Sequence, residues 1–210
     1  MRHTAGLSVL LATLSIFGKG SDAPHPIAGL PRENYAFESH IRLRRWDKPR
    51  VTLHVADPGT GIEPGDAKRR TAQAASLWNE ATGDTVYLVV TEEAGADITV
   101  RFVPASSLPP QAVGRTTTLF RSVSGTLVRG EVRVREDLSE AQSIQAIAHE
   151  LGHALGIQGH SDEPRDLMYF RSHLPAVVTR ADANTLRIAY SETLRSDPDR
   201  RSEIDSVPPH

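Results

Sequence analysis

The residues best suited to chemistry stand together in the stretch HELGHALGIQGH, residues 149–160. His149 and His153 are four residues apart, so on a helix their imidazoles share one face about one turn from each other. Gly156 tolerates the positive φ at which a helix can stop and the chain reverse, which lets His160 arrive from the returning segment. This pattern predicts one zinc ion held by His149, His153 and His160.

Glu150 directly follows the first histidine, so its carboxylate points into the same cleft and need not bind the metal. Three neutral imidazoles leave zinc its double positive charge and an open fourth position, and such an ion lowers the pKa of a bound water toward about 7. We expect Glu150 to take the proton from this water and deliver it to the leaving amine, while zinc polarises the scissile carbonyl. The chain has no cysteine, so a zinc site must use histidine and carboxylate.

The helix carrying this motif is expected to begin near Ser139 or Ser143, since either can cap it. At 100° per residue, His149 and His153 lie almost opposite an arc of apolar side chains, which consists of Ile144, Ile147, Leu151 and Leu155. One side of the helix can therefore pack on a core while the other presents ligands. Histidines on a merely solvated face would explain this amphipathicity equally well, but not the glutamate, glycine and third histidine together.

The other elements that must position the site are predicted from periodicity. Alternating or continuous apolar residues indicate strands, and apolar residues at helical spacing indicate an earlier helix that Asp66 can cap. The strands are expected at residues 51–55, 86–90, 97–102, 113–120 and 128–135, and the helix at 66–82. A strand, a long helix and two further strands open a layered sheet-and-helix domain. His54 is expected on the outer face of its strand, away from the metal site.

The two ends of the chain differ from this central part. Residues 1–23 are expected to be a signal peptide, because Arg2 precedes an apolar run at 7–17 that is too short to span a bilayer. A buried N-terminal helix is the alternative. Residues 24–44 hold several prolines and are expected to be a linker or short pro-segment, and residues 193–210 a disordered polar tail. The mature protein is expected to be secreted or periplasmic, without stable membrane insertion.

The charge of the chain limits its partners. Lysine and arginine number 24 and aspartate and glutamate 26, so the formal net charge of −2 gives no case for nucleic acid. The basic run at residues 42–50 is interpreted as a solvated edge, with a membrane-surface role as the alternative. Hydrophobic content of 39% is ordinary for a soluble globular protein, which we expect to be a monomer.

The segment after the third histidine adds a resemblance to a known family. Ser161-Asp162 and Asp166-Leu167-Met168-Tyr169 follow it, and H-E-x-x-H-x-x-G-x-x-H with a methionine shortly afterwards resembles the metzincin clan of zinc peptidases. The chain is most similar to the matrixin-like branch, including its bacterial members. The resemblance extends over about residues 45–192 through further similar residues: Trp46, Leu77-Trp78-Asn79, Ala96-Asp97-Ile98 and Thr179-Arg180-Ala181-Asp182.

The resemblance implies an α+β catalytic domain at residues 45–192, with a mixed twisted sheet of about five strands, two long helices and a C-terminal helix after the Met-turn. It also implies that the three motif histidines bind the catalytic zinc, that Glu150 is the base, and that Met168 forms a hydrophobic floor beneath the metal. Residues 169–174 would form a wall of the pocket. The edge strand, expected at 113–120, would hold an extended peptide by strand addition.

The chain departs from the family pattern at several points. Phe170 stands where matrixins usually have proline, and where astacins and serralysins have a tyrosine that assists the oxyanion, so that role does not pass to Tyr169. Without cysteine, the matrixin cysteine-switch latency is absent. No calcium loop or second histidine-rich zinc segment is recognisable, so we expect one catalytic zinc ion, and the sequence gives no indication of calcium. His173 is a conceivable extra ligand, with a surface position as the alternative.

The sequence therefore predicts an exported zinc-dependent endopeptidase that acts on polypeptide substrates. One alternative is a zinc-dependent amide hydrolase with a non-protein substrate, such as a cell-wall crosslink, since the same chemistry would serve it. The other is a zinc-containing module that binds a peptide without cleaving it. The intact Glu150 argues against that module, because losing this carboxylate is the simplest route to inactivity.

Overall fold

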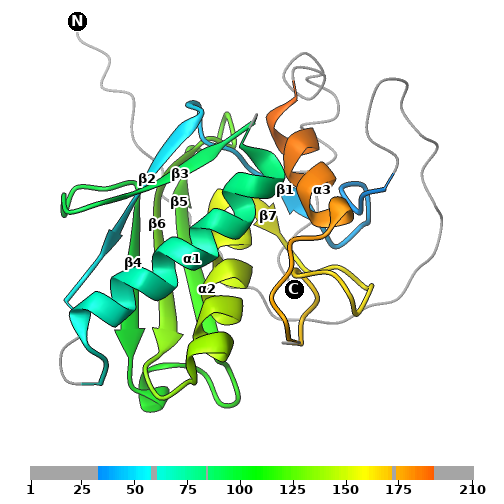
Figure 1. The fold of residues 1–210 in the computed structure, drawn as a ribbon. Helices are drawn as coiled ribbons and strands as arrows, with labels where there is room; N and C mark the ends of the chain where they lie inside the picture. Colours follow the sequence, from blue (N-terminus) through cyan, green and yellow to red (C-terminus); the bar gives the residue numbers. More distant parts are fainter. Residues whose placement is uncertain (1–32, 58–60, 84, 172–173, 192–210) are drawn as a thin grey trace, which may run out of the picture.

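The computed structural model of the chain describes residues 33–57, 61–83, 85–171 and 174–191 (Figure 1). The predicted signal peptide, the predicted tail and His173 lie outside the described residues. Among the residues that are described, no helix has both the length and the apolar character needed to cross a membrane.

A five-stranded sheet forms one layer of the domain. Its strand order is β3 (Tyr87–Thr91), β2 (Arg50–Val55), β4 (Ile98–Val103), β6 (Leu127–Arg135) and β5 (Gly114–Phe120). Neighbouring strands are parallel except at β5, which runs antiparallel to β6, so the sheet is mixed. Each predicted strand is confirmed to within one residue at either end, and the strand expected at the sheet edge is the edge strand β5.

Two long helices, α1 (Pro64–Thr82) and α2 (Glu140–Leu155), lie side by side across one face of this sheet (Figure 1). Figure 1 also shows α3 (Arg180–Tyr190) grouped with the short strands β1 (Arg42–Leu43) and β7 (Ile157–Gln158) beyond one end of the sheet. A short 3-10 turn, residues 105–107, follows β4. The predicted α+β class, with a mixed sheet, two long helices and a final helix, is confirmed.

The core lies between the sheet and the two long helices. Inward side chains of the strands alternate with half-exposed outward ones, so Val132 and Val134 are fully buried while the arginines beside them are not. These valines belong to a cluster that joins the sheet to α1 and α2 and includes Leu53, Trp78, Ile98, Ile147 and Leu151. The core therefore fixes α2, the helix with the histidine motif, against the sheet.

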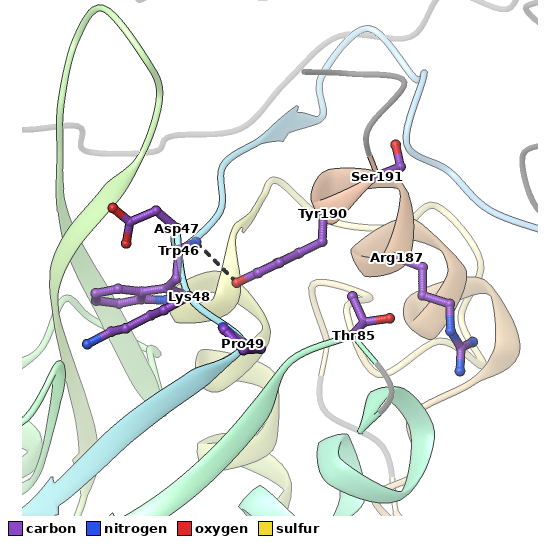
Figure 2. A pocket seen from close by; sticks show the side chains of 8 residues that line it. All are labelled: Trp46, Asp47, Lys48, Pro49, Thr85, Arg187, Tyr190 and Ser191. Atoms are coloured by element: carbon purple, nitrogen blue, oxygen red, sulfur yellow. Dashed lines mark hydrogen bonds between the residues drawn. The ribbon is translucent and has the colours of Figure 1, made fainter. Parts of the chain in front are cut away.

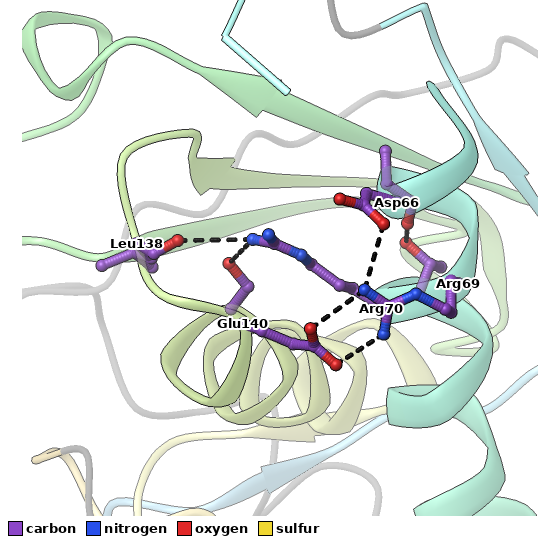
Figure 3. Close-up of polar contacts among 8 residues, drawn as sticks. Asp66, Arg69, Arg70, Leu138 and Glu140 are labelled. Atoms are coloured by element: carbon purple, nitrogen blue, oxygen red, sulfur yellow. Dashed lines mark hydrogen bonds and ion pairs between the residues drawn. The ribbon is translucent and has the colours of Figure 1, made fainter. Parts of the chain in front are cut away.

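The start of α1 differs from the prediction that Asp66 caps it. The N-cap is Glu63 and proline occupies the first helical position, where its missing N–H costs no hydrogen bond. Asp66 lies in the first turn and forms an ion pair of 3.0 Å with Arg69. Arg69 also reaches Glu140 at the start of α2, with 2.9 Å between Nη2 and Oε2 (Figure 3). These contacts join the N-terminal ends of the two helices.

Two aromatic side chains, Trp46 and Tyr190, hold the far end of α2, and Figure 2 shows the hydrogen bond between these two residues. The indole Nε1 of Trp46 donates to the Ala154 carbonyl at 3.1 Å. The Tyr190 hydroxyl donates to the Leu155 carbonyl at 2.9 Å and accepts from the Trp46 backbone N–H at 3.3 Å. A cavity of about 340 Å³ opens beside this contact, and none of the motif histidines lines it. The contacts tie α3 and the chain before β2 to the end of α2.

Residues 33–44, the described part of the predicted linker or pro-segment, pack on the domain. Tyr35 and Ile41 are buried, and β1 pairs antiparallel with β7, which follows α2. This segment therefore lies against the chain that leads from the histidine helix to α3. Whether residues 24–44 act as a pro-segment stays a prediction.

Candidate metal centre

The helix α2 begins at Ser139 and presents two histidines opposite the core. Ser139 accepts from the Gln142 backbone N–H while the Gln142 side chain accepts from the Ser139 N–H, a capping box. The other candidate cap, Ser143, instead accepts from Arg70 at 3.0 Å. The predicted apolar arc is buried at Ile147, Leu151 and Leu155 and partly buried at Ile144. The helix is thus oriented as its sequence predicted.

Gly156 ends the helix in the manner expected of it. Its φ is 130°, a value that L side chains rarely adopt. A Cβ added here would meet the Arg44 carbonyl oxygen at 2.0 Å. The glycine therefore allows both the reversal of the chain and the close approach of the β1 segment.

The three predicted histidines come together. The ring centroids of His149 and His153 are 4.9 Å apart, those of His149 and His160 are 5.2 Å apart, and those of His153 and His160 are 5.0 Å apart. One nitrogen from each ring lies within 4.8 Å of the others, a spacing that could hold a metal ion.

Hydrogen bonds orient two of the rings. The Nδ1 atoms of His149 and His153 contact the carbonyl oxygens of Leu167 and Ile157, each at 2.7 Å. A carbonyl oxygen only accepts, so both Nδ1 atoms carry the proton and each Nε2 keeps a lone pair for a metal.

Burial disfavours the charged form of two of the imidazoles. Burial, with the neighbouring histidines, lowers the pKa of His153 well below its ordinary value and that of His160 to about 4. Three imidazoles brought together in this way are a donor set that suits zinc, which binds the neutral ring.

Met168 packs against α2 at Gly152, the residue before His153. It is fully buried, and a Cβ added at Gly152 would lie 2.3 Å from its Sδ atom. Because Gly152 precedes His153 directly, the absence of a side chain there lets the thioether approach the helix beside the site. This position agrees with the hydrophobic floor that the family resemblance implied.

Hydrogen bonds from distant residues hold the segment that carries His160. The backbone N–H groups of Leu167 and Met168 donate to the buried Asp182 carboxylate at 2.8 and 3.3 Å. The Tyr35 hydroxyl donates to the same carboxylate at 2.6 Å. In the sequence, Asp182 stood out only as part of the family-like stretch at residues 179–182, and the structure shows that it forms a capping box with Thr179 at the start of α3. Nothing in the sequence indicated Tyr35.

His160 itself is held from the N-terminal side. The Nε2 atom of His40 donates to the His160 carbonyl at 2.9 Å. At Gly159, where φ is 130°, a Cβ would meet the His40 carbonyl oxygen at 2.6 Å. The backbone N–H of Ser161 donates to the Met168 carbonyl at 2.9 Å. The third candidate ligand therefore depends on contacts with both the N-terminal segment and the turn at Met168.

Glu150 is buried beside the histidines and contacts the edge strand β5. Its Oε2 atom accepts from Thr116 Oγ1 at 2.6 Å. A Cβ added at Gly114 would lie 2.8 Å from both Cγ and Oε1 of Glu150, so this glycine leaves room for the carboxylate. Burial raises the pKa of Glu150, although the nearby His149 and the Thr116 hydrogen bond lower it. A carboxylate of raised pKa in a cleft is suited to accept a proton.

Sequence analysis missed both residues of β5 that contact Glu150. Gly114 and Thr116 occupy alternate positions of the strand, which places them on the same face, toward α2. Only the pairing of β5 as the edge strand next to β6 brings that face to the helix. The strand pattern alone therefore contained no signal for them.

Two other groups of side chains lie outside the histidine cluster. His54 lies on β2 and is not part of the cluster, as predicted. Glu38, His40 and Asp162 also bring ligand atoms within 4.8 Å of one another, but His40 and Asp162 are exposed and His40 Nε2 already donates to a carbonyl.

Comparison with known proteins gives one result. A family model described as matrixin matches residues 45–190, a span that contains the sheet, the three helices and the histidine cluster. A search of curated proteins finds no match to the chain.

Proposed function

The chain belongs to the matrixin family of metallopeptidases, and from this membership we propose that it is an exported zinc-dependent endopeptidase. In this proposal His149, His153 and His160 hold one zinc ion and Glu150 is the general base. The observation that carries it is the convergence of three imidazoles, two of them oriented by hydrogen bonds, beside a buried carboxylate. The family supports polypeptide as the substrate class.

A zinc ion bound by the three imidazoles would supply Lewis acidity and a water acidic enough to lose a proton near neutral pH. Glu150 holds that proton and later releases it to the leaving amine. Because Thr116 donates to Oε2, the Oε1 atom is the oxygen left to take up the proton. Gly114 keeps the space next to Oε1 free of a side chain.

The edge strand β5 is the proposed binding site for the substrate backbone. One side of β5 pairs with β6 and its other side pairs with no strand among the described residues. An extended peptide can add to such an edge through backbone hydrogen bonds. Since Gly114 and Thr116 contact Glu150, a peptide along β5 would pass close to the carboxylate.

The remaining parts of the chain are assigned by the same proposal. Residues 1–23 direct export and are removed, which makes the mature protein secreted or periplasmic. Residues 24–44 act as a linker or short pro-segment, residues 45–192 as the peptidase domain, and residues 193–210 as a polar tail. The mature protein acts as a monomer that inserts into no membrane and binds no nucleic acid. These assignments are supported by the composition of each segment.

The test is cleavage of a diverse peptide mixture by the purified chain from residue 24 to 210, with and without a chelator. We expect cleavage that the chelator abolishes and added zinc restores. The matched control is Glu150→Ala, which should keep zinc and lose at least about 100-fold in kcat/KM, as expected when a general base is removed. Full activity of Glu150→Ala would contradict the role of Glu150.

The same experiment separates the alternatives. Zinc-dependent peptide binding without cleavage would assign the non-cleaving module. Chelator-sensitive hydrolysis of a cell-wall amide crosslink, with no peptide cleaved, would assign the non-protein substrate. Because an endopeptidase and an amide hydrolase would share the zinc and base chemistry, only a comparison of peptide and cell-wall substrates distinguishes them.

A further inference from the structure

A row of arginines crosses the sheet face that is turned away from α1 and α2. Arg133 of β6 lies directly opposite Arg101 of β4 on one side and Arg115 of β5 on the other. Neighbouring strands are about 4.8 Å apart, so the row spans about 10 Å. All three face outward, since the residues before and after Arg133 are fully buried valines.

The arginines of this row have fewer ion-pair partners toward β5 than toward the middle of the sheet. Arg101 forms an ion pair of 3.3 Å with Glu131. Within the part of the chain that the structure describes, the side chains of Arg133 and Arg115 form no ion pair and no hydrogen bond, and Arg115 is exposed. Arg129 adds a further exposed charge on the outward side of β6. The chain as a whole carries a formal net charge of −2, so this basic face is a local feature.

Folding does not explain the row. Like charges directly opposite each other on neighbouring strands are destabilising, and among the described residues no carboxylate forms an ion pair with Arg133 or Arg115. An anionic group placed next to Arg115 would offset this repulsion. The free side of β5 is where such a group can approach.

We propose that Arg115, backed by Arg133, selects substrates that carry aspartate or glutamate at one outward-facing position. This inference rests on the proposed function, in which an extended peptide adds to β5. Side chains of an added strand alternate between the two faces, so those next to Gly114 and Thr116 face the Glu150 side. The substrate residue opposite Arg115 faces outward and continues the row by one strand, within about 5.5 Å between Cβ atoms.

The experiment uses one peptide that the enzyme cleaves and places glutamate, glutamine or lysine in turn at each position around the scissile bond. We expect one position at which kcat/KM for glutamate exceeds that for glutamine by about three- to fivefold, and that for lysine by more. The preference should fall toward unity in 1 M salt, where the screening length is about 3 Å.

The variants identify the arginine responsible. Arg115→Glu should invert the ratio, so that the lysine peptide becomes the better substrate at the same position. The matched control is Arg50→Glu, an identical charge change at an exposed residue of β2, which lies three strands away from β5. The control should keep the original ratio. A glutamate preference that survives Arg115→Glu would overturn the inference.

Failure of this inference can be told apart from failure of the proposed function. If no peptide is cleaved, the proposed function fails, and selectivity is then measured as binding of the glutamate and lysine peptides to the zinc-loaded Glu150→Ala protein. If peptides are cleaved with no charge preference at any position, the arginine inference alone fails. Binding of duplex DNA or anionic vesicles that requires Arg115, without peptide selectivity, would overturn the substrate as the anionic partner.

Discussion

His149 and His153 lie on α2, whereas His160 lies on irregular chain between β7 and α3, and the two parts of the site are held by different means. The helix is capped by Ser139, ended by Gly156 and buried along one side. Each of these features comes from residues within the helix or next to it. The two helix-borne histidines are therefore placed by local rules of sequence.

The part that carries His160 depends on contacts between residues far apart in the chain. His40 donates to the His160 carbonyl across 120 positions, and Tyr35 donates to Asp182 across 147. Residues 33–44, which precede the sheet in the chain, and α3, which follows His160, thus both support the part of the site that carries His160. One candidate site can therefore combine side chains placed by local sequence with a side chain placed by tertiary structure, and each part should respond differently to mutation.

The largest effect is expected from removing a helix-borne ligand. His153→Ala should lose stoichiometric zinc and at least about 1000-fold in kcat/KM, because the metal contributes several kcal/mol to the reaction. Its circular dichroism should change little, since the cap and core of α2 remain. Zinc content and peptide cleavage are measured beside His54→Ala, a histidine outside the cluster that should retain both. Stoichiometric zinc in His153→Ala would contradict the assigned ligand set.

The next effect is expected at the junction between the two parts. Gly156→Ala puts a Cβ at a φ of 130° and at 2.0 Å from the Arg44 carbonyl oxygen, so the backbone must move. We expect a loss of about 3 kcal/mol in the free energy of unfolding. Gly65→Ala is the control, because nothing lies within 4 Å of its added Cβ. Denaturant titration checks this, and equal stability of both variants would show that the junction is not strained.

Most of the fold could be predicted because it follows from local patterns. The strands and the ends of α2 depend on alternation, capping residues and glycine, all readable within a few positions. The start of α1 was misassigned because Pro64 at the first helical position competes with Asp66 as a start signal. Ser139 and Ser143 could not be separated by sequence, since only tertiary structure brings Arg70 to the second serine.

The histidine cluster could be predicted from the sequence, but the residues that support it could not. The spacing of the histidines and the family resemblance predicted that His149, His153 and His160 come together, which the structure confirms, while their roles as ligands and that of Glu150 as base stay predictions. Thr116, Tyr35 and the long-range role of Asp182 depend on strand order and on the packing of residues 33–44. No local pattern encodes which distant side chain will donate to a given carboxylate.

A test of the tertiary part is removal of the Asp182 carboxylate. Asp182→Ala leaves the N–H groups of Leu167 and Met168 without their buried acceptor, which we expect to cost about 2 to 3 kcal/mol. Hydrogen exchange should increase at residues 159–168 and remain low along α2. Asp137→Ala, at an exposed carboxylate paired with Arg135, should change stability by no more than about 0.5 kcal/mol. An equal increase in hydrogen exchange at residues 159–168 and along α2 would show that the two parts of the site are not held by different means.

A smaller effect is expected at the long-range contact between Glu150 on α2 and Thr116 on β5. Thr116→Val removes the hydroxyl that donates to Glu150, and we expect kcat to fall about tenfold, which is about 1.4 kcal/mol, with zinc content unchanged. Thr116→Ser keeps the hydroxyl and should restore kcat. If Thr116→Val retained full kcat, the helix alone would be enough to position Glu150, and the local part would need no tertiary support.

The smallest effect is expected from Tyr35→Phe, which removes one hydroxyl and leaves the aromatic packing in place. Asp182 keeps its backbone donors in this variant, so the loss should be about 1 kcal/mol of unfolding free energy, measured by denaturant titration. Burial raises the pKa of Tyr35 well above its ordinary value, so the hydroxyl stays a donor and the loss should be constant from about pH 6 to 9. Tyr87→Phe, at an exposed tyrosine of β3, controls for the substitution.

The decisive measurement for Tyr35→Phe is whether zinc affinity falls together with stability. If the N-terminal segment positions His160, zinc affinity should fall a few-fold along with stability, because Tyr35 and the turn at Met168 share the Asp182 carboxylate. Loss of stability with unchanged zinc affinity would mean that the segment contributes to the fold and not to the metal centre. His160 would then depend on the Met168 turn and α3 alone, and residues 33–44 would play no part in positioning it.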